Sequence, residues 1–122
     1  MFRFRERCQI LFSEPISLLA TGPLAVTIPE SKGFAVDEVG LVVVALTGAI
    51  ILQPSVSFGF VGSPAALKAT ALTTALTAVD KRERYQTLLL DDVLPTLAAD
   101  ITAAATGPSV YTARFYFRGI LY

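Results

Sequence analysis

The residues best suited to bind a partner are arginines spaced two or four positions apart near both ends of the chain. Arg3, Arg5 and Arg7 occupy alternate positions of the first segment, and Arg114 and Arg118 share one parity of the last. Alternate side chains of a strand point to the same face, so this spacing predicts basic strand faces. Further cations stand in the longest run of charged residues, near the middle of the chain. We expect a protein-interaction surface drawn from Arg3, Arg5, Arg7, Arg114, Arg118, Lys81, Arg82 and Arg84.

Aromatic residues alternate with some of these arginines, a combination that platforms for single-stranded nucleic acid use. The parity of Phe4, however, places its side chain on the face opposite the arginines. Ten Lys and Arg are also balanced by ten Asp and Glu, so the chain has no global attraction for nucleic acid or for anionic membranes. We therefore expect protein docking, with neither direct nucleic-acid binding nor membrane binding.

The residue types that most enzymes need are scarce. The chain has no His and no Trp, and Cys8 is its single cysteine, which removes histidine-based acid–base chemistry and multi-thiolate metal sites. Adjacent acids occur as Asp37-Glu38 and Asp91-Asp92, but neighbours on a strand point to opposite faces, so both pairs favour turns over a two-carboxylate site. No spacing typical of a metal or phosphate site is present. We expect a protein that is not an enzyme and needs no metal or cofactor.

Length and composition predict one small domain with apolar surface to spare. The 122 residues are most simply a single domain over 1–122, and 53% of them are hydrophobic while 16% are charged. The charge-free stretch from Val39 to Leu67 has a continuous apolar part of only 14 residues, short of the roughly 20 that a membrane span needs. No span is expected. Apolar surface beyond the needs of one core instead predicts a homo-oligomer.

The periodicity of the sequence is that of strands. Apolar and polar residues alternate over 2–12, 24–28, 56–60 and 111–118, and Gly, Pro and acidic residues separate these segments. Ser63-Pro64 is a good helix start and predicts one short helix near 63–69, with strand or loop after Ala69. About eight strands with one short helix predict a mainly β fold: an antiparallel β-sandwich, jelly-roll-like in its order of strands.

The same alternation predicts which large side chains are buried. They are Phe2, Phe4, Ile10, Phe12, Leu41, Val43, Phe58, Phe115 and Phe117. The first strand is accordingly expected to turn its phenylalanines to the core and its arginines to solvent.

Three segments of the chain resemble small bacteriophage virion proteins of the capsid decoration, or cement, type. They are Gly33–Gly40 leading into an apolar strand, Pro54–Gly59, and the closing Tyr111–Gly119. The likeness lies in strand order, apolar richness and abrupt strand ends. It implies a β-rich, non-enzymatic and often trimeric protein that clamps neighbouring major capsid subunits. It also implies a place on the capsid surface of the virion, after synthesis in the host cytoplasm.

Two alternatives stay open from the sequence. One keeps the chain in the virion but makes it a neck, tail or fibre-attachment component. The other is a jelly-roll carbohydrate-binding module, against which the absence of Trp and the core parity of most Phe residues count, because such sites stack sugars on exposed aromatic rings.

Overall fold

A computed structural model describes residues 8–27, 34–89 and 96–121, and over these residues the protein consists of strands and loops with no helix. Nine strands are present: β1 (Cys8–Phe12), β2 (Ile16–Ser17), β3 (Gly22–Thr27), β4 (Phe34–Thr47), β5 (Ser55–Phe60), β6 (Ser63–Leu72), β7 (Arg82–Leu89), β8 (Thr96–Ala103) and β9 (Val110–Leu121). The predicted mainly β class is confirmed, with nine strands where about eight were expected.

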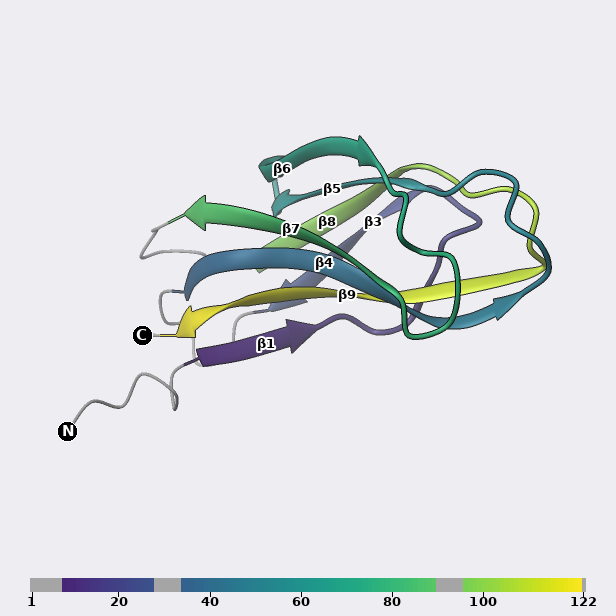
Figure 1. The fold of residues 1–122 in the computed structure, drawn as a ribbon. Coiled ribbons are helices and arrows are strands. Elements are labelled where there is room, and N and C mark those ends of the chain that lie inside the picture. Colours follow the sequence, from purple (N-terminus) through teal and green to yellow (C-terminus); the bar gives the residue numbers. More distant parts are fainter. Residues whose placement is uncertain (1–7, 28–33, 90–95, 122) are drawn as a thin grey trace.

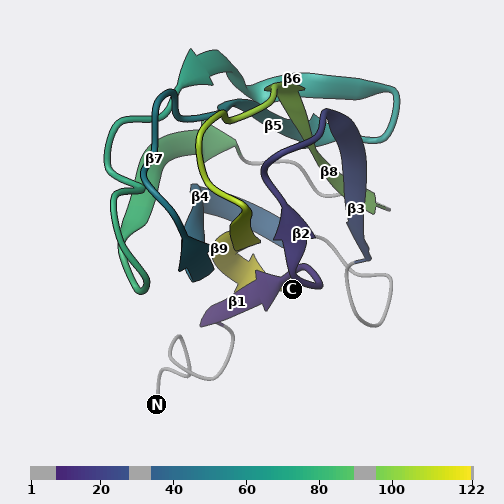
Figure 2. The same ribbon diagram turned by 90° about the vertical axis from the view of Figure 1, so that its right-hand side faces the viewer.

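The strands form two antiparallel sheets that face each other (Figures 1 and 2). Sheet A has the order β1-β9-β4-β7, with the short β2 also paired to β9, and sheet B has the order β3-β8-β5-β6. Four antiparallel pairs are nested around the β5–β6 turn: β5 with β6, β4 with β7, β3 with β8, and β1 with β9. One long hairpin rolled into two sheets in this way is a jelly roll, as predicted.

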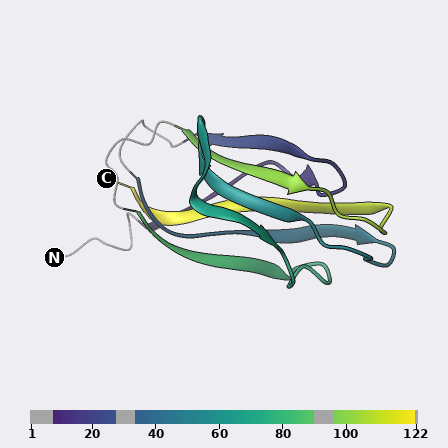
Figure 3. The ribbon, with the colours of Figure 1, turned by 90° about the horizontal axis from the view of Figure 1, so that it is seen from above.

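The longest ladder of the molecule joins β4 and β9, which run side by side along the sandwich (Figure 3). It sets Val39 opposite Phe117 and Leu41 opposite Phe115, and all four side chains are buried. Phe58 of sheet B meets them from the other side, with ring centroids 5.6 Å from Phe115 and 5.8 Å from Phe117. These rings join the two sheets through the middle of the core.

Most of the predicted core residues that the structure describes are buried. The prediction is confirmed for Leu41, Val43, Phe58, Phe115 and Phe117. It is wrong for Ile10 and Phe12, which are 47% and 49% exposed, while Leu11 packs against the core. Phe2 and Phe4 lie outside the described residues.

The error in β1 comes from the partner strand. Phe12 lies opposite Tyr116 on β9, and residues opposite each other in an antiparallel pair share a face. Phe115 and Phe117 face the core, so Tyr116 and its partner Phe12 face outward. Alternation within one strand shows that it has two faces, but the register with its neighbour decides which face is buried.

The helix predicted near 63–69 is wrong, because Ser63–Leu72 forms β6. Ser63 lies opposite Phe60 across a turn in which Gly62 has φ +92°, so Ser63 begins a returning strand where a helix cap was expected. β6 is an edge strand, where a proline such as Pro64 is tolerated. Pairing with β5 outweighs the helix propensity of the alanines, which amounts to only tenths of a kcal/mol per residue (about 0.5). The strand-or-loop expectation after Ala69 is confirmed, since β6 ends at Leu72 and a loop follows.

Candidate functional site

The outer face of sheet A gathers all four of the described arginines that the sequence singled out. Cross-strand register places three rows of residues there, running from β1 through β9 and β4 to β7. The first row holds Ile10, Arg118, Glu38 and Gln86; the second holds Phe12, Tyr116, Gly40 and Arg84; the third holds Arg114, Val42 and Arg82. We call these eleven residues the basic face.

Tyr116 is the centre of the basic face and is only 3% exposed, although it points away from the core. Gly40 makes this possible: a Cβ at that position would meet the Tyr116 ring at 2.8 Å and the Glu83 carbonyl oxygen closer still. The ring therefore lies over the glycine backbone of the neighbouring strand. Phe12 covers one side, with ring centroids 6.1 Å apart, and the Arg82 guanidinium lies 5.8 Å from the Tyr116 ring centroid.

The Tyr116 hydroxyl donates a hydrogen bond of 2.7 Å to Oε2 of Glu38, whose side chain is also buried. Burial raises the pKa of Tyr116 well above its usual value near 10, and the bond to the Glu38 carboxylate raises it further. Arg82 and Arg84 act in the opposite direction on this pKa, so their positive charge is felt at the hydroxyl. Tyr116 is a fixed hydrogen-bond donor at any ordinary pH.

Two acids hold Arg118 in place. Its Nε donates to Oδ1 of Asp37 at 3.1 Å, and its Nη1 lies 3.6 Å from Oε1 of Glu38. The pair Asp37-Glu38 was expected to be a turn, and this is wrong, because both residues lie within β4. The ladders of β4 shift register between Val36 and Glu38, and this irregularity lets two consecutive acids reach the same arginine.

The remaining arginines of the basic face carry charge that the described residues do not neutralise. Arg82, Arg84 and Arg114 are exposed and form no ion pair with another described residue. Four arginines thus stand against two carboxylates, Asp37 and Glu38, both of which already contact Arg118. The result is a positive surface on a chain of zero net charge.

The turn before β7 positions Arg82. Asp80 has φ +72°, its amide donates to the Val43 carbonyl at 2.9 Å, and the Val43 amide donates to the Lys81 carbonyl at 3.0 Å. Glu83 points to the other side of β7, where its Oε1 accepts hydrogen bonds from the amides of Thr74 and Ala75 at 2.9 and 2.8 Å. The start of β7 is therefore fixed on both sides, and Arg82 and Arg84 project from a rigid strand.

A small hollow of about 120 Å³ opens on the basic face beside Tyr116. We call it the Tyr116 hollow. Its lining combines apolar residues from β1 and β4 with arginines from β7 and β9: Ile10, Phe12, Glu38, Val42, Arg82, Arg84, Tyr116 and Arg118. It offers positive charge at one side and exposed hydrocarbon at the other.

The structure brings together four of the eight predicted site residues: Arg82, Arg84, Arg114 and Arg118. Lys81 precedes β7 and does not line the Tyr116 hollow. Arg3, Arg5 and Arg7 lie outside the described residues. The first and last strands do pair, as the predicted gathering of terminal arginines requires.

Sequence reasoning missed the residues that shape the hollow. Tyr116 shares the parity of Arg114 and Arg118, and this signal was sufficient to place it on the basic face. Glu38 had no comparable signal, because the uninterrupted apolar run over 41–46 that follows it does not show which face of the strand is buried. Ile10 and Phe12 were predicted to be buried, because alternation within β1 does not show which of its faces the register with β9 turns outward.

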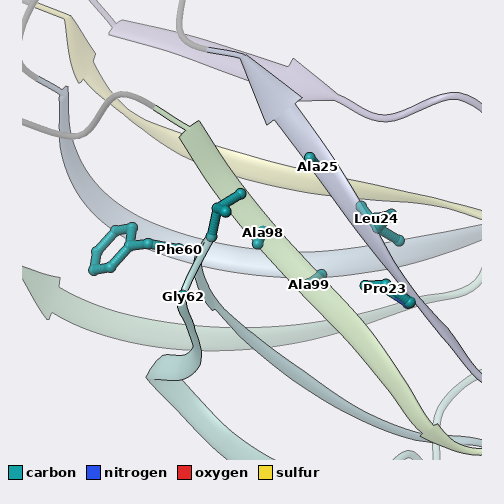
Figure 4. Close-up of a pocket in the computed structure, with 8 residues that line it drawn as sticks. Pro23, Leu24, Ala25, Phe60, Gly62, Ala98 and Ala99 are labelled. Atoms are coloured by element: carbon teal, nitrogen blue, oxygen red, sulfur yellow. The ribbon is translucent and has the colours of Figure 1, made fainter.

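A second and larger hollow, of about 370 Å³, lies on sheet B (Figure 4). Its lining comes from β3, β8, the end of β5 and the β5–β6 turn and contains no charged side chain, with Pro23, Leu24 and Ala98 as typical members. Figure 4 shows only carbon atoms on the drawn side chains. This hollow can hold apolar groups, but it offers no side chain that would orient a ligand.

Among residues 8–27, 34–89 and 96–121, no group of three or more His, Cys, Asp or Glu is placed to hold a metal ion. The same described residues contain no helix long and apolar enough to cross a membrane.

Comparison with known proteins finds a similar fold among solved structures and no match by sequence. No protein-family model matches the chain, and no curated protein matches it significantly. Among solved structures, the chain resembles one from the "Cyanophage Pam1 capsid asymmetric unit", with a TM-score of 0.60 and 16% sequence identity. The alignment covers 94% of this chain and 85% of that one, so the two share a fold over nearly their whole lengths.

Proposed function

We propose that this protein is a structural component of a bacteriophage virion, made in the host cytoplasm and bound to the capsid surface as a decoration protein. The observation that carries the proposal is the fold it shares with a chain of a cyanophage capsid asymmetric unit, over 94% of its length. The sequence resemblance to small phage virion proteins points the same way. The proposed role is non-enzymatic: the major capsid protein or another virion protein is the partner.

The basic face is the surface that we assign to attachment. Its arginines stand on a sheet whose register and turns are fixed, so little backbone entropy is lost when a partner binds, and the entropic cost is confined to the arginine side chains. A positive surface of this kind selects an acidic patch by charge complementarity. The N-terminal arginines Arg3, Arg5 and Arg7 are proposed to extend this surface.

Self-association into a trimer belongs to the same proposal. Apolar side chains are exposed where the β4–β5 and β8–β9 loops meet. Ile51 is 80% exposed, and Leu52 and Val110 are also exposed. The isolated bridge between Leu52 and Thr106 holds these two loops together. Exposed apolar groups on an ordered loop pair favour an interface between copies.

Binding to purified capsids tests the proposed function. Capsids that lack the protein are sedimented with it over a series of salt concentrations, and we expect saturable binding that weakens as ionic strength rises above about 0.15 M. The Arg114→Gln substitution should weaken binding, whereas Lys81→Gln, which removes the same charge outside the basic face, should have a smaller effect. Electron microscopy of the complexes then locates the protein.

Each outcome separates the open alternatives. Density on the capsid lattice supports decoration, and density at the neck or tail would move the protein to that part of the virion. Absence of binding to any part of the particle would overturn the proposal.

A further inference from the structure

We propose that the Tyr116 hollow is a receptor for a single acidic side chain of a partner protein, with an apolar neighbour of that side chain packed on Ile10 and Phe12. The inference rests on the proposed function for the identity of the partner as a virion protein. It goes further by naming the contact, its chemistry and the residues that make it.

The size of the hollow sets the size of the ligand. A cavity of about 150 Å³ in a protein core admits one benzene molecule. The Tyr116 hollow, at about 120 Å³, is slightly smaller and therefore takes one side chain. A carboxylate on a short hydrocarbon stem matches a site with arginines on one side and apolar groups on the other.

The charges around the hollow favour a carboxylate over a neutral or basic group. Arg82 and Arg84 reach it from β7 and have no ion pair among the described residues. The negative charge of Glu38 is the one feature that opposes an anion. Its Oε2 already accepts the Tyr116 hydroxyl, and Oε1 lies 3.6 Å from Arg118, so both oxygens are engaged before a ligand arrives. Two unmatched guanidinium groups then face the entering carboxylate.

The exposed apolar rim distinguishes a protein partner from nucleic acid. Ile10 and Phe12 are about half exposed and lie on β1, across Tyr116 from the arginines of β7. A base can stack on the Phe12 ring, but a nucleotide has no aliphatic side chain to pack on Ile10, whereas a peptide with a leucine beside its acidic residue covers both. Ordered aromatic and arginine side chains at the centre of a patch are also typical of binding hot spots in protein interfaces.

The site can be tested on the isolated protein with short peptides. The probes are the capped peptide acetyl-Gly-Leu-Glu-Leu-Gly-amide and its twin with Gln in place of Glu, titrated into ¹⁵N-labelled protein. We expect saturable shifts of backbone amide resonances in 82–84 and 114–118, with affinity for the Glu peptide about tenfold higher because charge-assisted hydrogen bonds are the stronger kind. Arg84→Gln should weaken binding of the Glu peptide about fivefold or more, and Lys81→Gln should leave it unchanged.

Phe12→Ala supplies a second variant with a different readout. It should lower the affinity for both peptides to a similar degree, because it removes an apolar contact and leaves the charges of the hollow unchanged. An unchanged spectrum away from the hollow shows in each case that the fold is intact.

Other results would overturn the inference. Equal affinity for the Glu and Gln peptides would remove the carboxylate from recognition, and shifts confined to another surface would remove the hollow. Stronger displacement by a short single-stranded oligonucleotide than by the peptide would make nucleic acid the occupant. Amide shifts at the hollow that depend on protein concentration would instead make a second copy of this chain the occupant. Capsid binding that persists while the peptides fail to bind defeats this inference alone, and peptide binding without capsid binding defeats the proposed function alone.

Discussion

Two tyrosines of sheet A differ in whether their hydroxyl has a partner, and removing that hydroxyl should have opposite effects on stability. The Tyr116 hydroxyl donates to the buried Glu38 carboxylate at 2.7 Å, while the Tyr85 hydroxyl is buried without a hydrogen-bond partner among the described residues. A hydrogen bond to a charged group contributes about 1.5–3 kcal/mol, and a buried polar group without a partner costs about 1–3 kcal/mol. Tyr116→Phe should therefore lower the free energy of unfolding by about 2 kcal/mol. Tyr85→Phe should leave it unchanged or raise it by about 1 kcal/mol.

Urea unfolding followed by far-ultraviolet circular dichroism gives the free energy of unfolding of both variants, and thermal unfolding followed by the same signal gives their Tm. In a chain of this length, a loss of about 2 kcal/mol lowers Tm by roughly 6–12 °C, well above the error of a melt. A double-mutant cycle with Glu38→Gln should give a coupling energy with Tyr116→Phe of about 1–3 kcal/mol, since the two side chains share one buried bond. Equal effects of Tyr116→Phe and Tyr85→Phe would refute the reasoning that links the hydrogen bond to the buried carboxylate.

Three further expectations follow from packing, titration and exposed surface. Phe115→Ala should lower the free energy of unfolding by about 3–5 kcal/mol and Phe12→Ala by about 1 kcal/mol, so that similar losses would contradict the assignment of the two faces. Burial, reinforced by the negative charge of Glu83, raises the pKa of Tyr85 and of Tyr111 to about 12. The unfolded chain loses these protons first, near pH 10, so stability should fall as pH rises from about 10 to 12, and a flat profile over that range would contradict it. Sedimentation should give a trimer, which Ile51→Asp should dissociate, and a wild-type monomer at micromolar concentration would remove self-assembly in solution.

The sequence carried enough information to predict the architecture but not the details of the basic face. The long alternation that ends in Phe115 and Phe117 predicted a strand and its buried face, because each residue repeats the same signal. Local signals failed where a partner strand decides: Ser63 has the chemistry of a helix cap, yet its position opposite Phe60 makes it the first residue of a strand. Phe12 shows the same limit, since only its register with β9 turns it outward.

The centre of the basic face depends on contacts between residues far apart in the chain. Gly40 is an ordinary strand glycine in the sequence, and its role is visible only when the ring of Tyr116 lies across it. Glu38 reaches Arg118 because it lies directly opposite it in the β4–β9 ladder, and it reaches Tyr116 because that residue is two positions away on the same face of β9. A single sequence lacks the pairing that creates both contacts, so the arginines of this site were predictable and the hollow between them was not.

The position of β9 has a consequence for the time at which the protein can first bind a partner. β9 is synthesised after the other eight described strands, yet it lies inside sheet A between β1 and β4. It also carries Arg114, Tyr116 and Arg118, the central column of the basic face. A nascent chain that has reached only β8 lacks the strand that joins β1 to β4 and lacks three residues of the basic face. Residues 110–121 therefore complete sheet A and the proposed attachment surface in the same step, so the proposed binding to a virion partner would begin only when the sheet is complete.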